Sequence, residues 1–453
     1  MNRPPVNIPK DLKNAARIFA DAGYQCWLVG GAVRDGLLGH GSEDYDLATD
    51  APPEIVIKLF HRTIPTGIKH GTVTILMGSH QFETTTFRTE GTYSDGRRPD
   101  EVSYSTDILD DLARRDFTIN AIAWNLIDEE LRDPHDGRQD LDSRIIRAIG
   151  KPAERFDEDG LRSIRACRFA AQLDFSIHPA TLEAIKGALS KIPNISPERI
   201  WEELKKILAA PEPSKAFNLF RRTGLLSIIL PELAACIGVT QKGRHVLDVF
   251  DHSLKTCDTA PRDNFPLRAA ALFHDIGKPP TKAIDHAGEV IFHGHEFAGA
   301  ELTEGILKRF KASNAHIDRV TRLVRHHMFH YTSDWTDAAV RRFMVRIGLD
   351  ILDDLLALRV ADASAIAPDL PEATSHLLEL LGRVDGILDS EQALGVKDLC
   401  VNGGILMKEL GIDPGPKLGT LLDYLLDCVL EDPNVNEKAK LIEMGRRWLE
   451  IFG

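Results

Sequence analysis

Two glycines and a run of acidic residues near the N-terminus have the types and spacing to bind a phosphate and a metal ion. Gly30 and Gly31 end the apolar run 26–29 and precede a segment of helical character. Backbone N–H groups at such a turn, beside a helix N-terminus, can approach a phosphate closely. Asp44 and Asp46 follow, and the alternation of side chains along a strand places both on one face. The pattern predicts a phosphate site next to a pair of carboxylates.

Glu83 supplies a third acid, on the neighbouring predicted strand 82–87. Three converging carboxylates suit Mg²⁺ ions, which activate a hydroxyl group and stabilise a leaving pyrophosphate. Asp44 and Asp46 alone would fit a solvated strand edge, so the third carboxylate is what favours a metal site. We therefore predict Asp44, Asp46 and Glu83 as catalytic residues, with Asp44 and Asp46 as ligands of Mg²⁺.

A second group of residues, far along the chain, has the composition of a transition-metal site. His274 and Asp275 are adjacent at the end of an apolar helical segment, and further histidines and Asp362 lie on other predicted helices. Histidine nitrogens together with carboxylate oxygens suit a divalent ion of borderline softness. One histidine on a helix is more often structural. A series of histidines on successive helices, beside an aspartate, favours a metal site.

The first group resembles a known family. Residues 28–39 (LVGGAVRDGLLG) and 44–49 (DYDLAT) resemble class II tRNA nucleotidyltransferases, the CCA-adding enzymes, and their poly(A) polymerase relatives. The resemblance implies that the 3′-hydroxyl of a tRNA attacks the α-phosphorus of CTP or ATP and that pyrophosphate leaves. It also implies that Gly30, Gly31 and Arg34 bind the triphosphate.

Residues 114–121 (RRDFTINA) resemble the ribose-recognition motif of this family. By that resemblance Arg115, Asp116 and Asn120 bind the nucleotide. An aspartate can accept a hydrogen bond from a 2′-hydroxyl, and an arginine can donate two hydrogen bonds to phosphate oxygens. An ordinary surface pair of Arg and Asp is the alternative that charge alone does not exclude.

Residues 158–162 (EDGLR) resemble the motif with which the family selects the incoming base. Residues three apart on a helix share a face, so Asp159 and Arg162 can present an acceptor and a set of donors to one base edge. Arg165 extends that face by a turn. Alternatively, the acidic residues stabilise a helix N-terminus and Arg162 forms a surface ion pair, and both roles can hold together.

The resemblance leaves the product open. Residues 88–99 resemble the flexible loop of the family, whose presence favours addition of the terminal A. Full CCA addition is the predicted function, and A-only, CC-only and poly(A) addition are its alternatives. The tRNA is expected to bind through its acceptor end and T-arm, with CTP and ATP as the other substrates.

The histidine-rich group resembles the HD-domain superfamily of metal-dependent phosphohydrolases, which also occurs fused to some tRNA nucleotidyltransferases. The resemblance implies a divalent ion such as Mn²⁺, Ni²⁺ or Fe²⁺. The ligands implied are His252, His274, Asp275 and Asp362, with His295 and His326 as candidates for a second ion or for substrate contacts. Phosphoester hydrolysis as the main activity is the rival function, and a metal site with a purely structural role is the plain alternative. An RNA-binding protein without catalysis is disfavoured, because binding RNA gains nothing from paired carboxylates.

The elements that must position these residues change in kind along the chain. Short β-rich runs at 26–29, 45–48, 72–76 and 82–87 predict one small sheet, and residues 53–60 read as a helix. Beyond residue 150 the apolar residues recur at helical spacing. We predict an α+β fold: a nucleotidyltransferase head resembling polymerase beta (1–150), a helical neck (151–215), a helical body containing the HD domain (216–365) and a tRNA-binding tail (366–453).

Composition limits the class of protein. With 43% hydrophobic and 27% charged residues, the 453-residue chain can form several packed domains. A net charge of −13 repels polyanions on average, so an RNA-binding surface must be a local cationic region. No apolar run reaches the roughly 18 residues that span a bilayer. We expect a cytoplasmic enzyme that binds no membrane, and we predict no protein partner.

Overall fold

The chain is described by a computed structural model. It describes residues 8–68, 71–90, 102–241, 246–366, 371–390 and 393–452, so most of the predicted flexible loop at 88–99 lies outside the described residues. The chain separates into two compact units, Met1–Ala234 and Ala235–Gly453. The finer division into head, neck, body and tail stays a prediction.

A mixed sheet forms the centre of the first unit and confirms the predicted α/β head. In the described part of the chain this sheet has seven strands in the order β3-β4-β5-β2-β1-β8-β9. Only β2 and β5 run parallel; the other neighbours are antiparallel. The strands are β1 (Cys26–Val29), β2 (Tyr45–Thr49), β3 (Thr63–Gly67), β4 (Thr72–Met77), β5 (His80–Thr86), β8 (Ala123–Asn125) and β9 (Leu131–Arg132).

The four predicted strands thus form one sheet, and the sequence-based prediction missed β3, β8 and β9, of which β8 is only three residues long. β3 has an exposed centre and β9 has two residues, so neither carries a strong apolar pattern. Short paired strands lie outside this sheet. They are β6 (Arg88–Glu90) with β7 (Val102–Tyr104), β10 (Ile145–Ile146) with β11 (Ser176–Ile177), and β12 (Ala283–Ile284) with β13 (Val290–Ile291).

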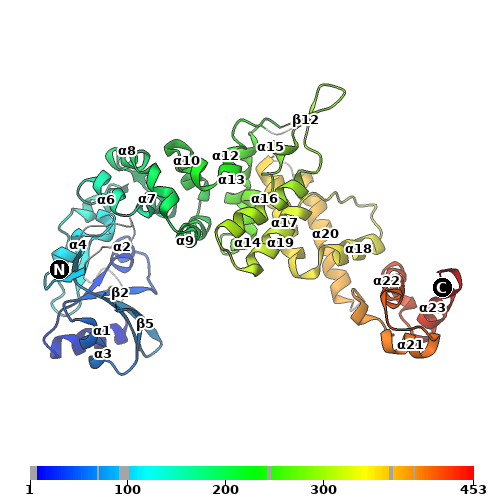
Figure 1. Cartoon of the computed structure of the whole chain (residues 1–453), viewed down its shortest axis with the longest axis horizontal. Coiled ribbons are helices and arrows are strands. Elements are labelled where there is room, and N and C mark those ends of the chain that lie inside the picture. The colour runs from blue at the N-terminus through cyan, green and yellow to red at the C-terminus, as the bar shows by residue number, and fades with distance from the viewer. Residues whose placement is uncertain are drawn as a thin grey trace. The chain divides into compact units, whose positions relative to one another are not determined.

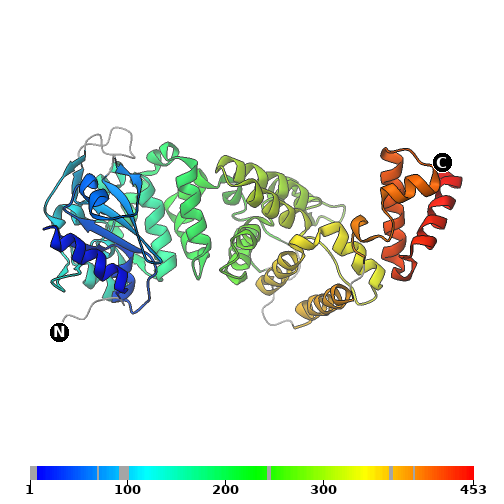
Figure 2. The ribbon, with the colours of Figure 1, turned by 90° about the horizontal axis from the view of Figure 1, so that it is seen from below.

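Helices cover both faces of the main sheet. Figure 1 shows α1 (Lys10–Asp21) and α3 (Pro53–Leu59) together on one side of it, and the dark blue α1 crosses the strands in Figure 2. The rings of Phe19 and Phe60 meet there at 5.1 Å between centroids. On the other face, Trp27 and Val29 pack in a buried cluster with Ile108 of α4 (Ile108–Ala113). β1 is therefore buried on both faces, and its end is held rigidly where Gly30 follows.

The rest of the first unit is helical, as predicted. Its helices are α2 (Gly31–Leu37), α5 (Gly137–Asp142), α6 (Pro152–Glu158), α7 (Leu161–Leu173), α8 (Pro179–Gly187), α9 (Pro197–Leu208), α10 (Pro213–Thr223), α11 (Leu225–Ile229) and α12 (Pro231–Ala234). Five of these begin with proline, a residue suited to the first helical position because it lacks the N–H group that would be unpaired there. α7 is largely buried and lies against α9 and α10.

The second unit is almost entirely helical. Its helices are α13 (Val249–Thr259), α14 (Phe265–Phe273), α15 (Lys278–Thr281), α16 (His295–Arg309), α17 (Asn314–His326), α18 (Asp337–Ile347), α19 (Leu349–Ile366), α20 (Pro371–Asp389), α21 (Gly403–Leu410), α22 (Pro416–Glu431) and α23 (Lys438–Phe452). α21, α22 and α23 share a core of leucines with Val401, Val429 and Trp448, and Figure 2 shows these helices grouped in orange and red. No helix in the described ranges is long and apolar enough to cross a membrane.

Candidate functional site

One cavity in the first unit gathers the nucleotide-site residues that the sequence predicts. This cavity, the head pocket, has a volume of about 740 Å³. Its lining includes every predicted catalytic and nucleotide-binding residue, namely Gly30, Gly31, Arg34, Asp44, Asp46, Glu83, Arg115, Asp116, Asn120, Asp159, Arg162 and Arg165. Most of the charged residues in the lining are arginines, so the acidic chain contains the local cationic region that RNA and nucleotides require.

The three carboxylates lie together because of the strand pairing. Asp46 is on β2 and pairs in register with Glu83 on the parallel neighbour β5, while Asp44 directly precedes β2. Burial, together with the charges of Asp44 and Glu83, raises the pKa of Asp46 to about 6, although the charge of Arg115 opposes the rise. A cation stabilises the charged form of a carboxylate whose pKa is raised in this way, so the three carboxylates fit Mg²⁺.

The turn after β1 requires glycine. Gly30 has φ +70°, and a Cβ atom there would lie 3.2 Å from Nη1 of Arg115 and 3.4 Å from Oδ2 of Asp46. A side chain would be both strained and in the way of the pocket. The glycine therefore brings the backbone close to a cation and a carboxylate of the site.

The predicted ribose motif forms a buried network. Asp116 accepts from Arg165 at 2.6 Å, from Nδ2 of Asn120 at 3.0 Å and from the N–H of Phe117 at 2.8 Å. Burial alone would raise the pKa of Asp116, but the charge of Arg165 and these hydrogen bonds outweigh it and lower the pKa to about 2. Asn120 also accepts from Nη1 of Arg34 at 2.8 Å. The network joins α2 to α7 through Asp116, which is charged at neutral pH.

The base-selection motif differs from its predicted local structure. Asp159 lies between α6 and α7 in an extended conformation and not on the helix that carries Arg162. The reason is that α6 ends at Glu158 and α7 begins only at Leu161. Oδ1 of Asp159 accepts from the N–H of Leu161 at 3.1 Å, so the helix-stabilising role is present too. Arg162 donates to Glu158 at 2.5 Å and to two backbone carbonyls. Both side chains nevertheless line the same pocket.

Several lining residues were not predicted from the sequence. Arg199 of α9 binds Asp159, with Nη2 at 2.6 Å from Oδ2 and Nη1 at 3.2 Å from Oδ1. The buried Glu203 contacts Arg165 and Arg168. The other unpredicted side chains in the lining include Arg168, Phe169, Gln172 and Lys206. The helical spacing of the residues from 199 to 206 was the available signal, but this spacing does not indicate which cations of α9 line a pocket.

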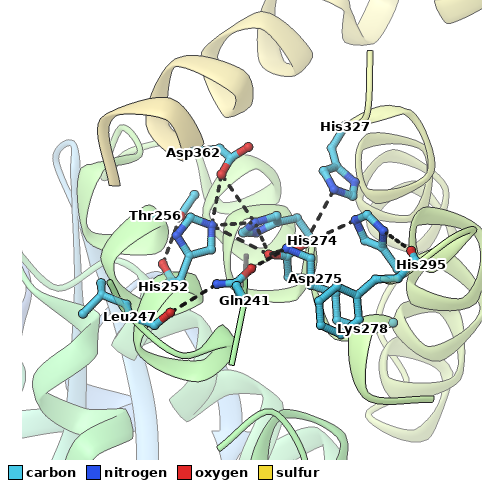
Figure 3. Close-up of polar contacts among 12 residues, drawn as sticks. Gln241, Leu247, His252, Thr256, His274, Asp275, Lys278, His295, His327 and Asp362 are labelled. Carbon is cyan, nitrogen blue, oxygen red and sulfur yellow. Dashed lines mark hydrogen bonds and ion pairs between the residues drawn. The ribbon is translucent and has the colours of Figure 1, made fainter. Parts of the chain in front are cut away.

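The second unit contains a buried cluster of histidines and aspartates (Figure 3). This histidine cluster consists of His252 on α13, His274 and Asp275 after α14, His295 on α16, His327 after α17 and Asp362 on α19. Among the described residues, two sets of three have ligand atoms within 4.8 Å of one another: His252 with His274 and Asp275, and Asp275 with His295 and His327. Asp362 joins the first set at 3.0 Å from Nε2 of His252.

Backbone carbonyls orient three of the histidines. The Nδ1 atoms of His274, His295 and His327 lie 2.7–2.8 Å from the carbonyl oxygen three residues earlier in each case. A carbonyl oxygen only accepts, so each Nδ1 carries the proton and each Nε2 presents a lone pair to the cluster. Nε2 of His295 and of His327 are buried and have no hydrogen-bond partner. Such a set of inward lone pairs fits a divalent cation.

The cluster contains His327 and not its neighbour His326, so His326 as a candidate for a second ion or for substrate contacts stays a prediction. His327 is 1% exposed and its Nε2 lies 3.8 Å from Oδ1 of Asp275. His326 is the last residue of α17 and belongs to neither set of ligand atoms. Consecutive residues at a helix end project in different directions, so only one of the two can face the cluster.

Close packing around Gly277 holds the second half of the cluster in place. A Cβ atom at Gly277 would lie 2.0 Å from the carbonyl oxygen of His295 and 2.5 Å from the N–H nitrogen of Gly299. Only glycine lets the start of α16 approach the segment after Asp275 this closely. Lys278 then donates to Oδ2 of Asp275 at 2.6 Å and to Gln241 at 2.6 Å.

The sheet, the glycine turn and the paired carboxylates define the class as a nucleotidyltransferase, and family comparisons agree. The Poly A polymerase head domain matches residues 26–147. The Probable RNA and SrmB- binding site of polymerase A matches residues 174–237, and tRNA nucleotidyltransferase domain 2 matches residues 298–444.

Full-length relatives narrow the class to a family. The CCA-adding enzyme of Lactobacillus johnsonii is 34% identical over 447 residues, covering 96% of this chain and 98% of that protein. The CCA-adding enzyme of Enterococcus faecalis is 32% identical, covering 97% of each. The crystal structure of the Bacillus stearothermophilus CCA-adding enzyme in complex with CTP has a TM-score of 0.75 at 27% identity, covering 99% of this chain and all of that one. The chain belongs to the CCA-adding enzyme family, whose members are nucleotidyltransferases that depend on divalent metal ions. The predicted resemblance to class II tRNA nucleotidyltransferases is confirmed, whereas the resemblance to the HD-domain superfamily stays a prediction.

Proposed function

We propose that this enzyme completes or repairs the 3′-terminal CCA of tRNA, using CTP and ATP without a nucleic-acid template. The observation that carries the proposal is the convergence of all twelve predicted residues on the head pocket. One bound nucleotide would then contact the backbone of the glycine turn, the paired carboxylates, the ribose motif and the base motif. Because its substrates are tRNA and nucleoside triphosphates, we place the enzyme in the cytoplasm.

The residues divide the work by chemistry. The glycine turn and Arg34 bind the triphosphate, and Asp116 accepts from the ribose 2′-hydroxyl. Asp44 and Asp46 hold Mg²⁺, with Glu83 as a third acid. When bound, Mg²⁺ supplies the positive charge that eases deprotonation of the tRNA 3′-hydroxyl and offsets the charge of the departing pyrophosphate. The hydroxyl oxygen forms a bond to the α-phosphorus as the bond to pyrophosphate breaks.

Base selection follows from the acceptor and donors of Asp159 and Arg162. Cytosine and adenine both carry an exocyclic amino donor next to a ring-nitrogen acceptor, whereas uracil and guanine carry the reverse pattern. A carboxylate beside a guanidinium therefore complements the first pair and opposes the second. No nucleic-acid template is needed for this distinction.

A gel assay tests the proposal with purified protein, Mg²⁺ and three RNAs: tRNA lacking CCA, tRNA ending in CC, and an unrelated RNA. With CTP and ATP, we expect three nucleotides on the first, one on the second and none on the third. Extension only of the second indicates an A-adder, and a stop after CC indicates a CC-adder. Long A tails on any RNA indicate a poly(A) polymerase, and no addition anywhere contradicts the proposal.

The histidine cluster supports a second candidate function, phosphoester hydrolysis of the HD type. The observation that favours it is the pair of buried Nε2 atoms of His295 and His327, which make no hydrogen bond and lie 3.4 and 3.8 Å from Oδ1 of Asp275. His252, His274, Asp275 and Asp362 would hold one divalent ion such as Mn²⁺, Ni²⁺ or Fe²⁺, and Asp275, His295 and His327 a second. Such ions supply a hydroxide nucleophile near neutral pH and polarise a phosphoryl group.

Metal content and hydrolysis test this second function separately from the first. We expect protein loaded with Mn²⁺ or Ni²⁺ to retain up to two ions per chain after desalting and to cleave bis(p-nitrophenyl) phosphate. His274→Ala should lose both properties, whereas Asp44→Ala should keep them. Retention of the ions without any cleavage would indicate a structural site, and cleavage that disappears with Asp44→Ala would contradict the assignment.

A further inference from the structure

Arg199 is the side chain whose contacts the proposed reaction leaves unexplained. It lies in the first turn of α9, where a cation is disfavoured by the helix dipole. Its guanidinium reaches across to the segment between α6 and α7 and binds both oxygens of Asp159. Both side chains are mostly buried, at 25% and 16% exposure. The ion pair with Asp159, and not the helix dipole, therefore accounts for an arginine at position 199.

The contacts leave Asp159 one free acceptor direction. A carboxylate has about four lone-pair sites. Oδ1 accepts from Nη1 of Arg199 and from the N–H of Leu161, and Oδ2 accepts from Nη2 of Arg199. One site on Oδ2 remains, and Asp159 lines the head pocket.

We infer that Arg199 is a positioning residue for base selection: it holds the Asp159 carboxylate in one orientation with a single free acceptor site, which admits a base with an amino group at C4 of a pyrimidine or C6 of a purine. This inference rests on the proposed function. A uracil or guanine places a carbonyl oxygen at the same point, and two acceptors repel each other. Without Arg199 the carboxylate can rotate, so its acceptor no longer lies opposite the carbonyl oxygen of the wrong bases.

The discriminating measurement compares CTP with an analogue in which hydrogen replaces the exocyclic amino group. The ratio of kcat/KM for CTP to that for the analogue reports the amino group alone, and the ratio for CTP to UTP reports selectivity. We expect Arg199→Met to lower both ratios by about 10- to 100-fold, the range of one hydrogen bond to a charged group. Arg199→Lys keeps the charge but donates at one point only, so its ratios should lie between those of Met and wild type.

Lys206→Met is the matched control, because Lys206 is another cation of α9 that lines the same pocket. This variant should weaken binding of all nucleotides similarly and leave both ratios within about 2-fold of wild type. A double variant, Arg199→Met with Asp159→Ala, should show ratios equal to those of Asp159→Ala alone, since Arg199 acts only through that carboxylate.

Unchanged ratios in Arg199→Met contradict the inference. If that variant does not fold, Arg199→Lys decides instead, and ratios equal to wild type there contradict it equally. Equal losses with Lys206→Met would show a general charge effect and overturn the specific role. Wild-type protein that adds no nucleotide to any tRNA would contradict the proposed function itself, a result distinct from active wild type with unselective variants.

Discussion

The head pocket and the histidine cluster use similar residue types in opposite ways. In the head pocket, charged side chains are paired mainly with one another, and they surround a cavity of about 740 Å³. In the histidine cluster, backbone carbonyls hold the rings, and the ligand atoms lie within 4.8 Å of one another. The first arrangement suits an exchangeable nucleotide, which binds in the cavity to charged groups that the ion pairs hold in place. The second suits a small resident ion that needs fixed geometry.

This contrast predicts that the two sites fail independently. Their residues belong to different compact units, and each site takes its geometry from its own unit. A variant of one site that lowers both activities would therefore contradict the independence of the two sites.

The largest expected effect is on nucleotide addition in Asp46→Ala. Removing one of the carboxylates on β2 and β5 removes a metal ligand, and we expect the single-turnover rate of C addition to fall by about 1,000-fold or more. Asp174→Ala is the control, since Asp174 carries the same charge in this unit but pairs with Lys215 away from the pocket lining. Addition that persists in Asp46→Ala would refute the metal assignment.

His274→Ala should have the converse effect. Loss of a ligand from the buried cluster should lower the affinity for Mn²⁺ or Ni²⁺ by about 10- to 100-fold. Metal analysis after dialysis measures how much of the ion each variant retains. C addition should stay within about 2-fold of wild type, because the head pocket lies in the other unit. A parallel loss of addition would show that the cluster supports the fold of the whole chain.

The next effect is on stability and sharpens the view of the cluster as a rigid site. Gly277→Ala places a methyl group 2.0 Å from the carbonyl oxygen of His295, so we expect the free energy of unfolding to fall by about 3 kcal/mol in urea titrations. Gly305→Ala on α16 meets no atom within 4 Å and should be neutral or stabilising by up to about 1 kcal/mol. Equal stability of both variants would contradict the close packing.

The two regions also differ in how far the sequence predicts them. The head-pocket residues belong to short local motifs, so residue types and spacing indicated the three carboxylates, and the resemblance of the motifs to a known family indicated the rest of the twelve. Arg199 contributes through an ion pair across 40 positions, and nothing near residue 199 indicates that contact. His327 was missed for another reason, since choosing between two adjacent histidines requires knowing where α17 ends. The α+β fold was predictable because β1 is an unbroken apolar run, whereas β3 and β9 lack such a pattern.

The smallest expected effect concerns pH and divides the head pocket itself. The pKa of Asp116 is lowered to about 2 from an ordinary 3.8, so the unfolded chain binds the proton more readily and acid favours unfolding. Asp116 therefore stabilises the fold above pH 4, and between pH 7 and pH 3 about 1 kcal/mol of that stabilisation should be lost. The pKa of Asp46 is raised to about 6, which has the opposite sign: without divalent ions its contribution is lost as the pH rises from 4 to 6.

Urea unfolding of the metal-free protein from pH 3 to 7 measures both slopes. Asp116→Asn should flatten the acid side of the stability profile, whereas Asp46→Asn should raise stability above pH 6 relative to wild type. Adding Mg²⁺ should cancel the second difference only, because the cation stabilises the charged form of Asp46. If both substitutions changed the pH dependence of the free energy of unfolding in the same direction, the two aspartates would not differ in role. That result would contradict the division into a paired Asp116 and an Asp46 that binds a metal ion.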